Sequence, residues 1–316
     1  MGLHKKVVIA LGGNALQEPH TSATAEAQLE VVKKTSEVIS NIKCLFGYEL
    51  VIVHGNGPQV GRILLASETA AALTPTMPLD VCTAMSQGYI GYHIQQGLSH
   101  ALAKHNRILP VVSLITQVVV DRDDPAFANP TKPIGEFYTE EEANILTRDK
   151  GYKMKEDAGR GWRRVVASPM PKRIVEIHAI RLLWDSTIVI TVGGGGIPVI
   201  EEEDGTLEGV AAVIDKDLAA EKLAEEVGAD ILMILTEVEK VSLNYQKPGQ
   251  VDLSTLTAAE CEKYINEGHF APGSMLPKIL AAKMFAESGP GKLTIITTLD
   301  KAVEALRGET GTAISN

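Results

Sequence analysis

Three lysines occupy positions where a positive charge is better explained by a bound anion than by the local sequence. Lys132 lies between Thr131 and Pro133 in a turn-rich segment, Lys216 lies between two aspartates at a predicted strand-to-helix junction, and Lys278 follows a glycine-containing turn at the start of an alanine-rich helix. Cations normally prefer helix C-termini, so a lysine at a helix N-terminus is better explained beside a bound polyanion. An ordinary surface lysine remains the alternative for each one taken alone. Together they favour a site for a phosphorylated ligand.

The chemistry that such a set can perform is phosphoryl transfer. That reaction needs cations on the transferring oxygens and in-line positioning of the reactants, with little covalent help from the protein. Lysines, backbone amides and Mg²⁺ meet this need. Asp217 follows Lys216 directly and can hold that lysine or approach the metal shell; the alternative is a stabilising carboxylate in the first turn of a helix.

Three glycine-rich loops follow apolar, strand-like runs. Val7–Leu11 runs into Gly12-Gly13-Asn14, Leu50–Val53 runs into His54-Gly55-Asn56-Gly57, and Ile188–Val192 runs into Gly193–Gly196. Glycine after a buried strand lets the backbone approach a ligand, and successive N–H groups there form an anion-binding nest. One such loop is explained equally well by a tight turn. Three loops predict strand ends that converge on a phosphorylated ligand.

Other nucleotide and metal motifs are missing from the sequence. It has no Gly-x-x-x-x-Gly-Lys-Ser/Thr loop. The run 55–61 misses the Gly-x-Gly-x-x-Gly spacing by one residue and places Pro58 inside the turn, and Ile197-Pro198 after Gly196 cannot open the helix that a dinucleotide-binding fingerprint requires. The His-Arg-Asp and Asp-Phe-Gly motifs of protein kinases are absent. The spacing of the histidines indicates no metal site, and no Ser/His/Asp or Cys/His arrangement is readable. A nicotinamide-binding oxidoreductase is therefore disfavoured.

Strand-like runs alternate with helical patterns along the chain. We expect helices over 21–46, 80–105, 217–227, 277–287 and 300–306, and strands over 209–214, 230–235 and 292–297. This alternation predicts an α/β fold with an open, mainly parallel sheet covered on both faces, an αβα sandwich, and ligands at the carboxyl ends of its strands. Residues 122–168 break the rhythm and are predicted to form an inserted excursion.

Charge and cysteine content narrow the class of protein. The 316 residues carry a net charge of −10, which argues against nucleic acid or an anionic membrane as a partner. Ten basic against four acidic residues between Arg148 and Arg181 either steer an anionic substrate or form a solvated face. Three scattered cysteines indicate a reducing compartment, and the uncharged run of 13 residues from Ile108 to Val120 is too short to span a bilayer. We expect a cytoplasmic protein.

Ten blocks of sequence resemble one known family. The chain is similar to the carbamate kinases of the amino acid kinase family over nearly its whole length and in the family's order. The blocks are 11–15, 54–61, 85–92, 124–127, 130–135, 161–166, 193–198, 213–219, 267–270 and 273–278. One departure is Ser168-Pro169, where the family pattern leads us to expect a proline first; it affects no residue with an expected role.

The resemblance implies the reaction ATP + carbamate ⇌ ADP + carbamoyl phosphate, with Mg²⁺, in a homodimer that makes ATP from carbamoyl phosphate in arginine catabolism. It implies a carbamate-binding lobe (1–121 and 169–206), a small protruding lid (122–168) and an ATP/ADP-binding lobe (207–316). Carbamate is already an anion, so no general base is needed. The expected partners include neither nucleic acid nor a membrane.

The resemblance also implies roles for individual residues. Lys132 contacts carbamate or the γ-phosphoryl group, Lys216 and Lys278 neutralise the β- and γ-phosphates, and Asp217 orients Lys216. The expected substrate and phosphate ligands are Gly12, Gly13, Asn14, Gly55, Asn56, Gly57, Gly194 and Gly195. The expected nucleotide-binding residues are Asp215, Val238, Tyr245, Gly273, Ser274, Met275 and Pro277. No protein side chain is assigned to the metal, because phosphates and water are expected to hold Mg²⁺.

Two alternatives stay open at this stage. Another acid kinase of the same family, acting on acetylglutamate or glutamate, would need a larger pocket with more arginine. A catalytically silent nucleotide-binding regulator on the same fold would be expected to lack one or more of the phosphate lysines, all three of which are present here.

Overall fold

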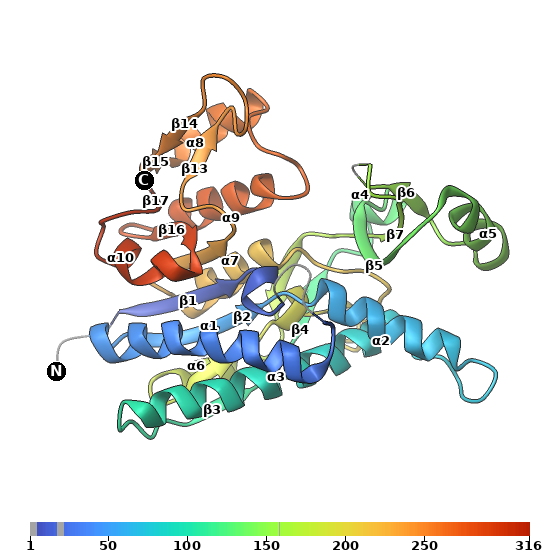
Figure 1. Cartoon of the computed structure of the whole chain (residues 1–316), viewed down its shortest axis with the longest axis horizontal. Helices are drawn as coiled ribbons and strands as arrows, with labels where there is room; N and C mark the ends of the chain where they lie inside the picture. The colour runs from blue at the N-terminus through green and yellow to red at the C-terminus, as the bar shows by residue number, and fades with distance from the viewer. Residues whose placement is uncertain (1–4, 18–21, 158) are drawn as a thin grey trace.

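A single eight-stranded sheet forms the centre of the molecule. The computed structural model describes residues 5–17, 22–157 and 159–316, and the strand order is β15-β17-β16-β12-β1-β2-β9-β3 (Figure 1). These strands are β1 (Lys6–Leu11), β2 (Glu49–His54), β3 (Val111–Ser113), β9 (Ile188–Ile190), β12 (Ile231–Thr236), β15 (Thr255–Thr257), β16 (Leu293–Thr298) and β17 (Thr312–Ser315). Neighbours pair in parallel except β16 with β17. The predicted mainly parallel α/β sheet is confirmed.

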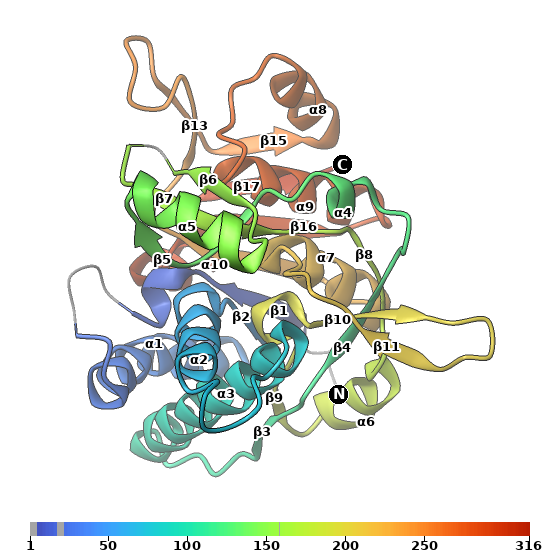
Figure 2. The same ribbon diagram turned by 90° about the vertical axis from the view of Figure 1, so that its right-hand side faces the viewer.

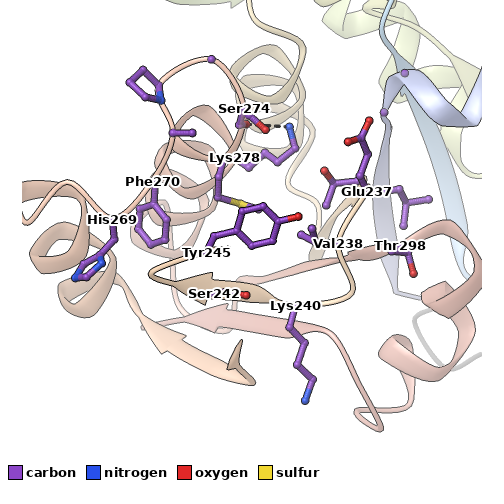
Figure 3. Close-up of a pocket in the computed structure, with 18 of the residues that line it drawn as sticks. Glu237, Val238, Lys240, Ser242, Tyr245, His269, Phe270, Ser274, Lys278 and Thr298 are labelled. Atoms are coloured by element: carbon purple, nitrogen blue, oxygen red, sulfur yellow. Dashed lines mark hydrogen bonds between the residues drawn. The ribbon is translucent and has the colours of Figure 1, made fainter. Parts of the chain in front are cut away.

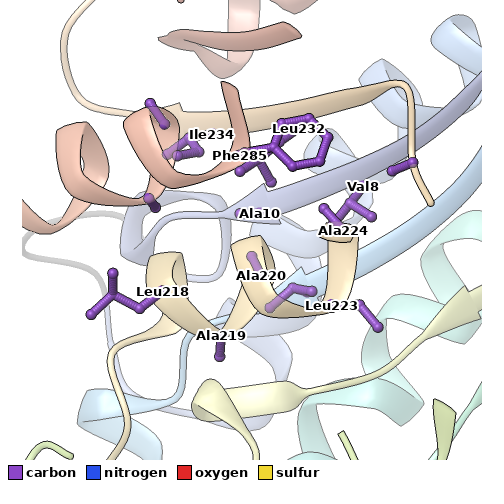
Figure 4. Close-up of a cluster of buried hydrophobic side chains, with 14 of the residues drawn as sticks. Val8, Ala10, Leu218, Ala219, Ala220, Leu223, Ala224, Leu232, Ile234 and Phe285 are labelled. Carbon is purple, nitrogen blue, oxygen red and sulfur yellow. The ribbon is translucent and has the colours of Figure 1, made fainter. Parts of the chain in front are cut away.

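Helices cover both faces of this sheet because alternate residues of its strands are buried on opposite sides. Val7, Ile9 and Leu11 of β1 pack with α1 (Ala25–Phe46) and α3 (Leu79–Lys104). Val8 and Ala10 pack on the other face with α7 (Lys216–Val227) and α9 (Met275–Glu287) (Figure 4). α6 (Ile177–Trp184) and α8 (Ala258–Asn266) complete this second layer. The period of two along β1 thus builds two apolar cores.

The three glycine loops meet at the carboxyl ends of neighbouring strands in the sheet. β1, β2 and β9 are consecutive neighbours and run parallel, so their carboxyl ends point the same way. Gly13–Ala15 forms the short helix η1 and Gly193–Gly195 forms η2, while α2 (Gly57–Thr69) starts within the third loop. The predicted convergence of these strand ends is confirmed.

The expected strand over 209–214 is wrong. β11 (Leu207–Gly209) ends where that strand was to begin, and a single bridge between Ala167 and Ala212 follows. Val213 and Ile214 are buried in two different apolar clusters as the chain crosses toward α7, so their hydrophobicity serves packing and not a strand ladder. β11 belongs to a second sheet of order β11-β10-β4-β8 that was not anticipated. Its other strands are β4 (Gln117–Val120), β8 (Pro171–Ile174) and β10 (Ile197–Glu201).

The remaining element predictions hold within small shifts. α3, α7 and α9 begin and end within two residues of their predicted bounds. α1 starts at Ala25, where the Thr24 hydroxyl caps the Ala27 N–H, and Thr21 lies outside the described residues. The closing helix is divided into η3 (Leu299–Lys301) and α10 (Ala302–Leu306), and β17 ends the chain instead.

The inserted segment folds into a small sheet of its own. Its strands β5 (Lys132–Tyr138), β6 (Met154–Glu156) and β7 (Trp162–Val166) pair in the order β5-β7-β6, next to α4 (Pro125–Ala128) and α5 (Glu140–Lys150). This segment projects from the body beside α2 (Figure 1). The hairpin β13 (Val241–Leu243) and β14 (Val251–Leu253) extends above the sheet near α8 (Figure 2).

The basic run between Arg148 and Arg181 makes internal ion pairs. Lys150 and Arg164 contact Glu68, and Arg160 and Arg163 contact Asp157. Further pairs join Lys172 to Asp121 and Arg173 to Glu201. Because acidic partners take up much of this charge, the run is better read as a set of structural contacts than as a steering surface. None of the helices in the described residues is long and apolar enough to cross a bilayer.

Candidate active site

The first turn of α7 gathers the three singled-out lysines. Lys216 Nζ lies 2.5 Å from Asp217 Oδ1, and Lys278 Nζ, from the first turn of α9, lies 3.0 Å from Asp217 Oδ2. Lys132 Nζ, from the start of β5, lies 2.7 Å from Asp215 Oδ2. Asp215 is the N-cap of α7, and its side chain accepts a hydrogen bond from the Asp217 N–H at 2.9 Å. Two carboxylates at one helix start therefore organise three cations from three separate elements.

Burial and charge act against each other in this cluster. Burial alone would raise the pKa of Asp217, but the positive charges of Lys216 and Lys278 outweigh it and hold that pKa well below its usual range. Burial lowers the pKa of Lys216, and the Asp217 charge partly offsets that effect. Lys216 therefore depends on Asp217 to stay charged in a buried place, where a polyanion would add further negative charge.

The glycine loops interlock around this cluster at close range. A Cβ placed on Gly194, whose φ is +68°, would lie 2.1 Å from Asn56 Nδ2, and one on Gly195 would lie 2.4 Å from the Ile214 carbonyl oxygen. A Cβ on Gly55 would lie 3.8 Å from Cδ of Lys216. The loops after β2 and β9 are thus packed against each other and against the approach to α7, with no room for side chains at Gly194 and Gly195.

Buried polar side chains fix these loops. Gln87 of α3 donates to the carbonyl oxygens of Thr116 and Gly193 at 3.1 and 2.9 Å and accepts from the Thr116 N–H at 2.8 Å. Asn56 Nδ2 donates to Ser86 Oγ at 2.8 Å. His54 Nδ1 lies 2.8 Å from the Gly55 carbonyl oxygen, and burial lowers the pKa of this imidazole to about 4. His54 is therefore neutral at pH 7 and donates to its neighbour's carbonyl.

A cavity of about 1000 Å³ opens next to the lysine cluster at the carboxyl ends of β1, β12 and β16. Gly12 and Gly13 line it on one side, and Lys216 and Lys278 contribute from α7 and α9. Figure 3 shows the Tyr245 ring lying across this cavity, with Phe270 on one side and Glu237 and Val238 on the other. A chamber with apolar groups such as Tyr245, Phe270 and Val238 in its wall, ending at the lysines and the glycine loop after β1, has the shape and polarity for a nucleotide.

Comparison with known proteins places this geometry in a family. The sequence profile of the amino acid kinase family matches residues 5–297. The chain belongs to the amino acid kinase family. Within it, the chain is 55% identical to a carbamate kinase of Clostridium perfringens and 55% identical to one of Pyrococcus horikoshii, each alignment covering 98% of this chain and 99% of the relative. The structure of a carbamate kinase from Giardia lamblia bound to AMP-PNP is 45% identical, with a TM-score of 0.91 over 100% of this chain and 99% of that one.

The structure distributes the predicted site residues of this amino acid kinase over two regions. The cavity is lined by Gly12, Gly13, Lys216, Val238, Tyr245, Gly273, Ser274, Met275 and Lys278. The residues Lys132, Gly55, Asn56, Gly194, Gly195, Asp215 and Asp217 lie at the loops and at the start of α7, outside that lining. Gly57 is the first residue of α2 and Pro277 the third of α9. The Asn14 side chain lies outside the part of the chain that the structure describes.

Two stretches of the cavity wall were not predicted. Glu267–Ala271 follows α8, and Thr298–Asp300 begins at the last residue of β16. The rule that ligands bind at the carboxyl ends of parallel strands could have identified the second stretch, because β16 ends at the same edge as β1 and β12. The sequence instead placed Asp300 at the start of a helix. Within the described residues, no three His, Cys, Asp or Glu side chains cluster as metal ligands do.

Proposed function

We propose that this chain catalyses reversible phosphoryl transfer between ATP and carbamate, giving ADP and carbamoyl phosphate. The observation that carries the proposal is the set of three lysines held by Asp215 and Asp217 at the first turn of α7, beside a nucleotide-sized cavity. The carbamate kinase relatives supply the acceptor, because they match this chain from end to end.

The site holds cations where phosphates would lie, and the carboxylates that contact these cations in the described part of the chain, Asp215 and Asp217, are already paired with them. His54 is neutral and its Nδ1–H is directed to the Gly55 carbonyl, so it is not arranged to take a proton from an acceptor. Carbamate needs no such base, because its oxygen is already anionic when it attacks the γ-phosphorus. The bond from that phosphorus to the β–γ bridging oxygen breaks, and ADP leaves with the electron pair.

We assign the parts of this step as follows. Lys216 and Lys278 neutralise the β- and γ-phosphates, Asp217 orients both, and Lys132 meets the transferring phosphoryl group from the side of the projecting segment. The peptide N–H groups at Gly12, Gly13, Gly55 and Gly194 bind carbamate and the phosphoryl oxygens. Tyr245, Val238 and Met275 border the adenine in the adjoining cavity.

Mg²⁺ enters this account as part of the nucleotide substrate. The carboxylate oxygens nearest the lysines already form ion pairs, because Asp217 contacts Lys216 and Lys278 and Asp215 contacts Lys132. This arrangement fits a metal carried by phosphate oxygens and water better than one held by the protein. The ion would neutralise charge on the phosphates and help to align them.

The wider organisation is also part of the proposal. Residues 1–121 and 169–206 would form the carbamate lobe, 207–316 the ATP/ADP lobe, and 122–168 a lid that closes over carbamate. We further propose a cytoplasmic homodimer that makes ATP from carbamoyl phosphate in arginine catabolism. The exposed Val81, Met85 and Tyr92, spaced along one face of α3, supply an apolar stripe for a second copy.

ATP formation from Mg-ADP and carbamoyl phosphate, read through a coupled enzyme, tests the proposal. We expect turnover far above the spontaneous decay of carbamoyl phosphate. Absence of ATP, with Mg-nucleotide still raising the unfolding temperature, would favour a different acid substrate or a silent nucleotide binder.

A further inference from the structure

One carboxylate on the body of the protein receives three side chains from the projecting segment. Glu68, in the last turn of α2, lies 3.1 Å from Arg164 Nη1 and 3.3 Å from Lys150 Nζ, and it accepts the hydroxyl of Tyr152. The Arg164 guanidinium lies 3.7 Å from the centre of the Tyr152 ring. Two members of the basic run between Arg148 and Arg181 therefore have a common partner outside their own segment.

This cluster is sheltered enough to matter energetically. The side chains of Glu68 and Arg164 are 17% and 22% exposed. Burial, together with the hydrogen bond to Glu68, raises the pKa of Tyr152 to about 12. The phenol therefore stays protonated at neutral pH and donates a hydrogen bond to Glu68. Partly buried pairs with several hydrogen bonds are stronger than isolated surface pairs, and breaking one leaves its partners uncompensated.

The cluster is connected to Lys132 through one strand pair. In the antiparallel ladder of β5 and β7, Arg164 lies opposite Ile134 and Val166 lies opposite Lys132. A shift of Arg164 therefore moves β7 and, through the ladder, the part of β5 that determines the position and direction of Lys132. No other element is needed to transmit the movement.

The close contact between α2 and β5 does not by itself fix the orientation of the projecting segment, so neighbouring side chains must do so. A Cβ on Gly61 of α2 would lie 2.5 Å from the Cα of Gly135, so the two backbones touch there without interlocking side chains. Ile134 packs with Val60 and Leu64 in an apolar cluster at the base. Glu68, two turns farther along α2, is the polar contact at the outer end.

We propose that Glu68 is a positioning residue for Lys132. It anchors the projecting segment to α2 and so holds the Lys132 ammonium at Asp215, on the first turn of α7. This inference rests on the proposed role of Lys132 in phosphoryl transfer, and it identifies a residue outside both regions of the site that tunes the reaction.

Steady-state kinetics of Glu68→Gln tests the link to Lys132. We expect kcat for ATP formation to fall about tenfold, because small misplacements of a catalytic group are costly, with KM for Mg-ADP unchanged. In a Lys132→Ala background the same substitution is expected to have no further effect on kcat. An equal fall in both backgrounds would overturn the proposal, since it would show an effect that does not pass through Lys132.

Glu136→Gln is the matched control. Glu136 lines the same small cavity as Glu68 and Arg164, and it takes part in no ion pair among the described residues. The Glu136→Gln substitution removes a carboxylate charge from the same small cavity between α2 and the projecting segment, and it is expected to leave kcat at the wild-type value. Tyr152→Phe removes one hydrogen bond to Glu68 and provides a milder variant if Glu68→Gln unfolds.

Hydrogen exchange tests the anchor without reference to activity. In Glu68→Gln, amides of 132–157 and 159–166 should exchange faster while those of α7 keep their rates. Acrylamide should quench Trp162 more strongly, because the only other tryptophan, Trp184, is fully buried. Unchanged exchange and quenching would overturn the anchor. If these change but wild-type enzyme makes no ATP, the anchor stands and the assigned reaction fails.

Discussion

Lys278 Nζ lies 3.0 Å from Asp217 Oδ2, although the two residues are 61 positions apart in the chain. The contact joins the first turns of α9 and α7, which pack side by side over the sheet. Lys216 contacts the other oxygen of the same carboxylate. Asp217 thus sets the spacing of two cations at the edge of the nucleotide-sized cavity, and it does so from a nearly buried position.

Replacing Asp217 by asparagine should disturb Lys216 through its protonation. Burial already lowers the pKa of Lys216, and the Asp217 charge opposes that effect. In Asp217→Asn the pKa of Lys216 should fall further, so the basic limb of the pH–rate profile should move to lower pH. We expect kcat at pH 8 to fall at least about tenfold. A pH–rate profile of ATP formation measures this, and a basic limb that stays in place would contradict it.

Removing a lysine should remove charge stabilisation from the transition state. Lys132→Ala and Lys278→Ala are each expected to lower kcat by at least about a hundredfold, as expected for loss of a contact to developing charge. Lys263→Ala, on the exposed face of α8, is the control and should keep wild-type kcat. Turnover near the wild-type value in a folded Lys132→Ala or Lys278→Ala enzyme would exclude that lysine from the chemistry.

A methyl group at Gly194 should push Asn56 out of place. In Gly194→Ala the new Cβ would lie 2.1 Å from Asn56 Nδ2, at a φ of +68°. We expect KM for carbamoyl phosphate to rise and stability to fall by about 1–3 kcal/mol. Gly205→Ala is the control, because Gly205 also has a positive φ, +82°, but open space around its Cβ. Equal effects of the two substitutions on KM would contradict a role for this loop in substrate binding.

Glu221 should make the protein less stable as the pH rises. Burial raises the pKa of this α7 carboxyl to about 7, and its Oε2 has no hydrogen-bond partner. Its folded-state pKa lies above the unfolded value, so its contribution is fully present below about pH 4.5 and is lost as the pH rises through about 7. Urea unfolding at pH 5 and pH 8 should show a loss of up to about 3 kcal/mol in wild type that is smaller in Glu221→Gln. The same loss in both proteins would assign it to another group.

The fold was predictable where a sequence pattern is typical of only one kind of structure. Apolar strand-like runs alternating with helical patterns indicated a mainly parallel sheet, and the glycines after three strands indicated where its carboxyl ends converge; both agree with the structure. Val213 and Ile214 misled the prediction because a buried apolar run packs equally well in a crossing segment. The antiparallel β17 was missed because it has four residues, of which only Ala313 and Ile314 are apolar, too short a run to indicate a strand.

The site was predictable in its charges and less so in its walls. Lys132 was conspicuous in its turn-rich segment between Thr131 and Pro133, and Lys216 and Lys278 were conspicuous at helix starts, where a cation is unfavourable without a bound anion; the structure brings all three to one helix start. Glu68 gave no signal in the sequence, since its partners lie 82 to 96 positions away. Long-range polar contacts of this kind appear only after the chain has folded.

Phosphorus NMR of purified protein with Mg-ATP tests the central claim most directly, with carbamate, glutamate or N-acetylglutamate offered in turn as acceptor. The account predicts ADP and a carbamoyl phosphate signal with carbamate alone, and loss of that signal in Lys278→Ala. Transfer to glutamate or N-acetylglutamate in place of carbamate, or no transfer to any acceptor, would contradict it.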